Sequence, residues 1–82
     1  MHSYQTHGTC SRRIDFDVQD GIVTACRFEG GCTGNTQGVA RLVVGRNVDD
    51  VIQMLKGIQC RGNTSCPDQL ARALEEYKLQ NA

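Results

Sequence analysis

One stretch decides the fold: 13-RIDFDVQDGIVTACRF-28, in which apolar and polar residues alternate on both sides of a two-residue break. Ile14, Phe16 and Val18 alternate with acidic and polar residues, which is the pattern of a strand with one buried face. Asp20-Gly21 is a strong hairpin dipeptide, because both turn residues must tolerate positive φ. The return strand should present two sets of side chains on opposite faces: Ile22, Thr24, Cys26 and Phe28 on one, and Val23, Ala25 and Arg27 on the other.

Helical spacing replaces the alternation downstream of this hairpin, and a short edge strand is expected upstream, over Met1 to Tyr4. Three helices are predicted from their apolar stripes and end signals. The first carries Val39, Leu42 and Val43 and ends at Gly45; the second begins at a capping Asp49, carries Val51, Ile52 and Leu55, and ends at Gly57; the third begins near Cys66 and carries Leu70, Leu74 and Tyr77. Strands followed by helices predict an α+β sandwich, a small antiparallel sheet with helices packed on one face.

Length and charge exclude several classes of protein. The chain has 82 residues, enough for one domain over 1–82 with a thin core. Nine Lys and Arg balance nine Asp and Glu without a basic stripe, which argues against nucleic-acid binding. No apolar run approaches the roughly 20 residues of a membrane span, and the polar N-terminus resembles no signal peptide, so we expect a cytoplasmic protein.

Five cysteines are many for a chain in a reducing compartment. Cys66 follows Ser65, a good N-cap, and Asp68 is placed as a variant capping box. A helix start favours a thiolate, the form that binds metal, and Cys32 stands before a helix predicted to begin near Asn35. Cys10 and Cys60 lie in polar, Gly-flanked loops, whereas Cys26 is in phase with the apolar strand residues and is predicted to be a core residue.

Four loop thiols therefore remain as candidate metal ligands: Cys10, Cys32, Cys60 and Cys66. Four thiolates suit a tetrahedral zinc, and an iron–sulfur cluster is the alternative. Their spacing contains no Cys-x-x-Cys pair, so the prediction depends on convergence of the loops at one end of the sandwich. His2 and His7 are alternative ligands, although solvated side chains are expected so near the terminus.

Other chemistry finds little support in the sequence. The glycines of 30-GGCTGN-35 have no Lys of the kind that phosphate-binding loops carry, and they are better explained by a turn. Asp15 and Asp17 alternate outward and should form a solvated strand face. No Ser–His–Asp arrangement is apparent, so no catalytic residues are assigned.

Three segments carry a family resemblance: 8-GTCS-11, 29-EGGCTGNTQGVARLVVG-45 and 57-GIQCRGNTSCPDQLARAL-74. They resemble the TSCPD domain family, which is named for the string at 64–68, over nearly the whole chain. The resemblance implies four characteristic cysteines, which correspond here to Cys10, Cys32, Cys60 and Cys66. It also implies a link to ribonucleotide reductases, because the module is found at the C-terminus of the adenosylcobalamin-dependent enzymes.

The order of elements also resembles the iron–sulfur scaffold proteins of the IscU type. Cys10, Cys32 and Cys66 match their cysteine positions, and 66-CPDQLARALEEYK-78 is similar to their final helix. The chain departs from that pattern because Ser11, not Asp, follows Cys10, because the LPPVK-type segment is absent, and because Cys60 is additional. The resemblance implies an IscU-like sandwich more strongly than it implies scaffold activity.

Three functions follow from the sequence. The first is a non-catalytic zinc or iron–sulfur module, accessory to a larger enzyme such as a ribonucleotide reductase. The second is an iron–sulfur carrier or scaffold with a labile cluster. The third is a dithiol redox protein that cycles Cys60 and Cys66. A chain of this size cannot by itself reduce ribonucleotides, and its thin core also favours a homodimer.

Overall fold

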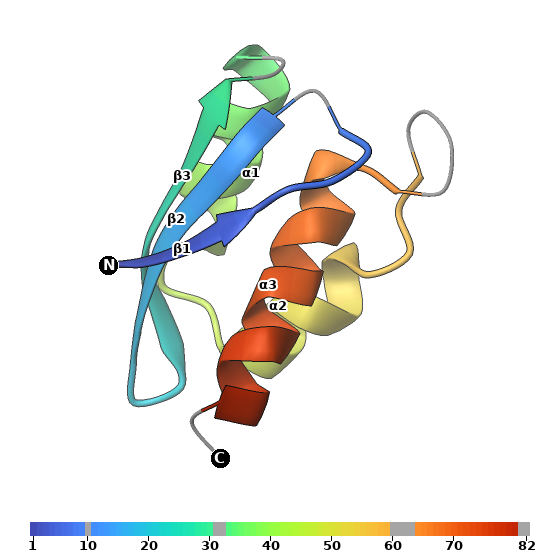
Figure 1. Cartoon of the computed structure of the whole chain (residues 1–82). Helices are drawn as coiled ribbons and strands as arrows, with labels where there is room; N and C mark the ends of the chain where they lie inside the picture. The colour runs from blue at the N-terminus through green and yellow to red at the C-terminus, as the bar shows by residue number, and fades with distance from the viewer. Residues whose placement is uncertain (10, 31–32, 60–63, 81–82) are drawn as a thin grey trace.

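The structure is a computed structural model of the whole chain, and it describes residues 1–9, 11–30, 33–59 and 64–80. Strands β1 (His2–Gln5), β2 (Ser11–Gln19) and β3 (Ile22–Gly30) form an antiparallel sheet in the order β1-β2-β3. Helices α1 (Thr33–Val43), α2 (Val48–Leu55) and α3 (Cys66–Gln80) follow, as Figure 1 shows. The predicted α+β class and the order of elements are confirmed.

The central hairpin forms as the sequence predicts, with one change of register. Asp20 and Gly21 adopt φ of 54° and 77°, the left-handed conformation that the tight turn requires. Asp17 pairs with Ala25 but Val18 pairs with Val23, so Thr24 is an extra residue in β3. The prediction that Val23 faces away from Cys26 and Phe28 was therefore wrong: the bulge turns Val23 into the core and leaves Thr24 exposed.

A single hydrophobic core lies between the sheet and the helices. Its fully or nearly buried members come from both layers: Ile14, Phe16, Val23, Val43, Val48, Val51, Leu70, Ala73 and Leu74. Cys26 and Tyr77 pack against this cluster from partly buried positions, as predicted for both. The predicted stripe of α1 was partly wrong, because Leu42 is 67% exposed and Ala40 takes the inward position.

The link between α1 and α2 extends the sheet edge beside the hairpin turn. Val23 N–H donates to the Arg46 carbonyl at 2.9 Å, and Gly45 N–H donates to the Val23 carbonyl at 2.7 Å. Asn47 caps α2 by accepting the N–H of Asp49 at 2.8 Å, so the prediction that Asp49 is the cap was wrong by two positions. The connection thus fixes two helices relative to β3.

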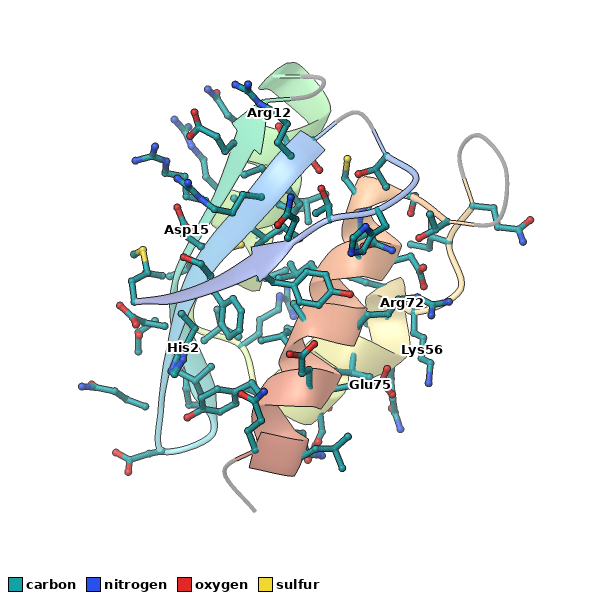
Figure 2. The ribbon with its side chains drawn as sticks, in the orientation of Figure 1. His2, Arg12, Asp15, Lys56, Arg72 and Glu75 are labelled. Carbon is teal, nitrogen blue, oxygen red and sulfur yellow. The ribbon has the colours of Figure 1, made fainter. Side chains whose placement is uncertain are left out.

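The outer face of the sheet carries polar and charged side chains, Asp15 among them (Figure 2). Part of this face is less exposed than predicted. Asp15 is only 8% exposed, because its neighbours on β1 and β2 cover it. Its carboxylate accepts the Ser3 hydroxyl at 2.7 Å and forms an ion pair with Arg13 at 3.1 Å. The Ser3 hydrogen bond, with help from Arg13 and against the effect of burial, lowers the pKa of Asp15. Within the described ranges, no helix is long and apolar enough to cross a membrane.

Candidate metal centre at the start of helix α3

The candidate site lies where the β1–β2 connection faces the first turn of α3. Cys66 is the first residue of that helix, as predicted, and it is half-buried. Its Sγ lies 3.2 Å from Oγ of Ser11, the first residue of β2. Gly8, with φ of 75°, approaches the same turn so closely that an added Cβ would lie 3.1 Å from the methyl carbon of Thr64. Two segments far apart in the sequence are thereby held together at one end of the molecule.

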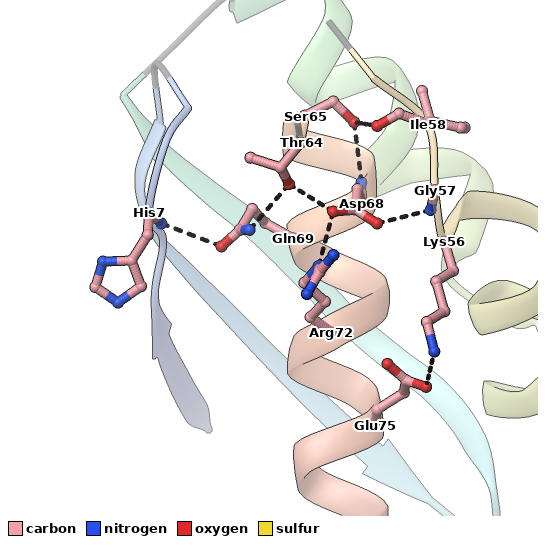
Figure 3. A network of polar contacts seen from close by, with 10 residues as sticks. All are labelled: His7, Lys56, Gly57, Ile58, Thr64, Ser65, Asp68, Gln69, Arg72 and Glu75. Atoms are coloured by element: carbon pink, nitrogen blue, oxygen red, sulfur yellow. Dashed lines mark hydrogen bonds and ion pairs between the residues drawn. The ribbon is translucent and has the colours of Figure 1, made fainter. Parts of the chain in front are cut away.

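Asp68 is the centre of a polar network in the first turn of α3 (Figure 3). Its carboxylate is fully buried and accepts three hydrogen bonds: from Gly57 N–H at 2.7 Å, from the Thr64 hydroxyl at 2.5 Å and from Arg72 Nε at 2.8 Å. Burial raises the pKa of Asp68, but the three donors outweigh burial and hold this pKa below its ordinary value. The carboxylate is consequently an ionised structural anchor. The predicted capping-box role was wrong, because its partners come from the preceding loop and from Arg72.

Ser65 has two roles at the same helix start. Its Oγ accepts the N–H of Asp68 at 3.1 Å, which confirms the predicted N-cap. The same hydroxyl donates to the Ile58 carbonyl at 2.5 Å. Since Ile58 and Ser65 bracket the loop that contains Cys60, this hydrogen bond closes the loop at its base.

Gln69 connects this network to the β1–β2 connection. Its side-chain amide nitrogen donates to the Thr64 hydroxyl at 3.0 Å, and its amide oxygen accepts the N–H of His7 at 3.1 Å. Thr64 in turn donates to Asp68, so one directed chain of hydrogen bonds runs from His7 to the buried carboxylate. Such a chain orders both loops around the helix start.

The structure describes one of the four predicted ligands, Cys66; Cys10, Cys32 and Cys60 lie outside the described residues. In the part of the chain that is described, no three His, Cys, Asp or Glu side chains form a group that could hold a metal ion. Of the two histidines, His2 packs against Phe16 and Tyr77, with ring centroids 5.5 and 4.7 Å away. His7 joins the hydrogen-bond network through its backbone N–H, and its side chain is exposed.

Cys26 belongs to a different environment from that of Cys66. It lies in β3 against the hydrophobic core, and burial raises the pKa of its thiol to about 12. Burial against apolar side chains disfavours the thiolate, which is the form of cysteine that binds metal. The described structure therefore supports the separation of Cys26 from the loop cysteines.

Comparison with known proteins identifies the family. A family model for the TSCPD domain matches residues 2–78, nearly the whole chain. The chain belongs to the TSCPD domain family. No curated protein and no solved structure matches the chain.

The five residues of the TSCPD string now have a physical description in this TSCPD domain. Thr64 passes a hydrogen bond from Gln69 to Asp68, and Ser65 caps the helix and closes the loop. Cys66 contacts Ser11, which lies 55 positions away in the sequence. Pro67 occupies the first turn, where a missing N–H costs least. Four of the five residues build the support on which the remaining one, the cysteine, is presented.

Sequence reasoning missed Ser11, Gln69 and the buried state of Asp68. An Asp three residues after a Ser is an ordinary helix-start signal, and nothing local reveals that Gly57 and Arg72 will reach its carboxylate. A signal for Ser11 was present in the quoted 8-GTCS-11, because a short polar side chain follows a candidate ligand directly. That segment does not indicate that Ser11 contacts Cys66, which lies 55 positions further along the chain.

Proposed function

We propose that this TSCPD domain is a non-catalytic metal-binding module in which Cys10, Cys32, Cys60 and Cys66 hold one metal as thiolates. Zinc suits such a ligand set best, because four thiolates form a closed tetrahedral structural site. An iron–sulfur cluster is the alternative that the same four ligands accept.

The observation that carries the proposal is the convergence of the described neighbours of these cysteines. Ser11 directly follows Cys10 in the sequence, and its Oγ lies 3.2 Å from the Cys66 sulfur. Ser11 also pairs with Gly30 of β3, which precedes Cys32 by two positions. Consecutive Cα atoms are about 3.8 Å apart, so the tethers from these points are short. Cys60 belongs to the loop whose ends meet at the Ile58–Ser65 hydrogen bond.

The donor chemistry at the helix start fits a metal-bound thiolate. Cys66 stands in the first turn of α3, where backbone N–H groups lack helical acceptors and the positive end of the helix dipole favours an anion. A bound zinc would supply a structural cross-link between the β1–β2 connection, the β3–α1 turn, the α2–α3 loop and α3. Structural zinc contributes about 10–16 kcal/mol in small domains, enough to dominate so thin a core.

Membership of the TSCPD family supports a link to ribonucleotide reductases, since this module resembles the accessory domain of such enzymes. We propose that the domain works in the reducing cytoplasm on or beside a larger enzyme, and not as a reductase itself.

Metal analysis of anaerobically purified protein tests the proposal. We expect one zinc per chain in the wild type. The zinc content or the zinc affinity should fall in each of four variants: Cys10→Ser, Cys32→Ser, Cys60→Ser and Cys66→Ser. Cys26→Ser is the matched control, because that thiol packs against the core, and it should keep the metal. Transferable iron with sulfide would favour a cluster carrier instead. A metal-free, folded protein with a reducible Cys60–Cys66 disulfide would contradict the proposal in favour of dithiol chemistry.

A further inference from the structure

The contact between Ser11 and Cys66 has chemical consequences beyond holding two segments together. Ser11 Oγ lies 3.2 Å from Cys66 Sγ, and Ser11 is only 4% exposed, so water competes little for this hydrogen bond. We infer that the Ser11 hydroxyl donates a hydrogen bond to the Cys66 sulfur and thereby withdraws electron density from that sulfur. The inference rests on the proposed metal-binding function for the state of that sulfur, and it makes Ser11 a positioning residue.

Among the residues that the structure describes, the hydrogen bonds around Ser11 leave its proton available for the sulfur. Thr6 donates to the Ser11 carbonyl at 2.5 Å. The Thr9 hydroxyl lies 3.2 Å from both the carbonyl oxygen and Oγ of Ser11, so its one proton can serve either acceptor. When Thr9 donates to Ser11 Oγ, the single Ser11 proton points to Cys66, and every hydroxyl in the group is satisfied.

The state of the sulfur fixes the direction of this chain. A protonated Cys66 can donate to Ser11, which then donates to Thr9, which donates to the Ser11 carbonyl. A thiolate or a metal-bound sulfur carries no proton and can only accept. Against a sulfur without a proton Ser11 is therefore the donor, and the 3.2 Å contact serves this direction without any movement of heavy atoms.

Ser11 is held firmly enough for this role. Its carbonyl accepts the Thr6 hydroxyl, and its backbone pairs with Gly30 in β3. Hydrogen bonds to ligand sulfurs are one of the ways in which proteins tune metal–thiolate sites. A donor fixed to one sulfur lowers the nucleophilicity of that sulfur and protects it from alkylation and oxidation.

Cobalt(II) is a suitable probe, because its sulfur-to-metal charge-transfer band reports the electron density at the ligands. In Ser11→Ala we expect this band at longer wavelength than in the wild type. Iodoacetamide should modify Cys66 of the cobalt form about 2- to 10-fold faster, which corresponds to the loss of one ordinary hydrogen bond.

Ser11→Thr, which restores a hydroxyl, should return both the band position and the modification rate toward the wild type. Thr24→Val, which removes an exposed hydroxyl of β3 outside this hydrogen-bonded group, is the control and should resemble the wild type. Unchanged band position and rate in Ser11→Ala would overturn the inference.

Failure of the proposed function would be visible separately, as a wild-type protein that binds no cobalt. The inference is then judged on metal-free protein, from the plateau that the rate of iodoacetamide modification reaches at high pH, which reports the nucleophilicity of the thiolate. Cys66 should again react about 2- to 10-fold faster in Ser11→Ala. Equal rates at Cys66 would overturn the role of Ser11.

Discussion

The carboxylate of Asp68 accepts the backbone N–H of Gly57 at 2.7 Å, which joins the end of α2 to the start of α3. With the Ser65–Ile58 hydrogen bond, this contact closes the loop between the two helices at its base. The loop that carries Cys60 is thus anchored at both ends to the helix turn that presents Cys66. This support for the proposed site is built from hydrogen bonds of the polypeptide alone.

Removal of the Asp68 charge should destabilise the domain. In Asp68→Asn the side chain keeps one acceptor oxygen and turns an NH2 group either toward the Gly57 N–H or toward the Thr64 and Arg72 donors. A buried polar group left without a partner costs about 1–3 kcal/mol, and we expect that loss in urea unfolding. Glu75→Gln is the control, because the exposed Glu75–Lys56 ion pair should contribute less than about 1 kcal/mol. Equal losses in the two variants would refute the anchoring role of Asp68.

Acid should weaken the domain through the same carboxylate. The hydrogen bonds from Thr64, Gly57 and Arg72 hold the pKa of Asp68 below its ordinary value of 3.8, so folding favours the ionised form. Its contribution to stability is complete above that ordinary value and is lost as the pH falls through the lowered pKa. We expect the free energy of unfolding to fall below about pH 4 in the wild type and to fall less steeply in Asp68→Asn. Asp15 and Glu29, whose pKa values are also lowered, contribute to the remaining slope, which Asp15→Asn should reduce. If the free energy of unfolding falls equally steeply with decreasing pH in the wild type and in Asp68→Asn, this explanation is contradicted.

The two roles of Ser65 can be separated by substitution. Ser65→Ala removes the N-cap and the loop closure together, and should cost about 1–2 kcal/mol or more. Ser65→Gly costs an N-cap only a few tenths of a kcal/mol but also lacks a donor for the Ile58 carbonyl, so most of its loss in urea unfolding measures the loop closure. A Ser65→Gly variant as stable as the wild type would mean that the Ile58 hydrogen bond contributes nothing.

Gly8→Ala tests the close approach of the β1–β2 connection to α3. A positive φ costs a residue with a side chain about 1–2 kcal/mol, at Gly8 and at Gly21 alike. At Gly8 the new Cβ would also press on Thr64, which cannot turn away without breaking its hydrogen bonds to Asp68 and Gln69. Gly21 has no atom within 4 Å of the same position. The thermal midpoint should therefore fall further in Gly8→Ala than in Gly21→Ala; the reverse order would contradict the observed contact.

The sequence predicts this fold well where structure depends on local signals. Asp20-Gly21 dictates the hairpin, and Ser65 before Cys66 dictates the start of α3. The errors arise where a local pattern is broken by one residue. The bulge at Thr24 reverses the faces of β3 on either side of it, and an alternation rule cannot foresee an inserted residue.

The candidate site was predicted less completely, because its parts meet through long-range contacts. The position of Cys66 follows from helix-start chemistry alone. The partnership of Ser11 with Cys66 and the burial of Asp68 depend on packing between segments that are distant in the sequence. Residue type and spacing therefore select candidate ligands, whereas the groups that support and tune them become visible in three dimensions.

X-ray absorption at the metal edge, on anaerobically purified protein, tests the central proposal most directly. Four cysteine thiolates around one zinc predict a single shell of four sulfur atoms at about 2.3 Å. A shell with fewer than four sulfurs, or a folded protein that carries no metal, would contradict the four-thiolate site.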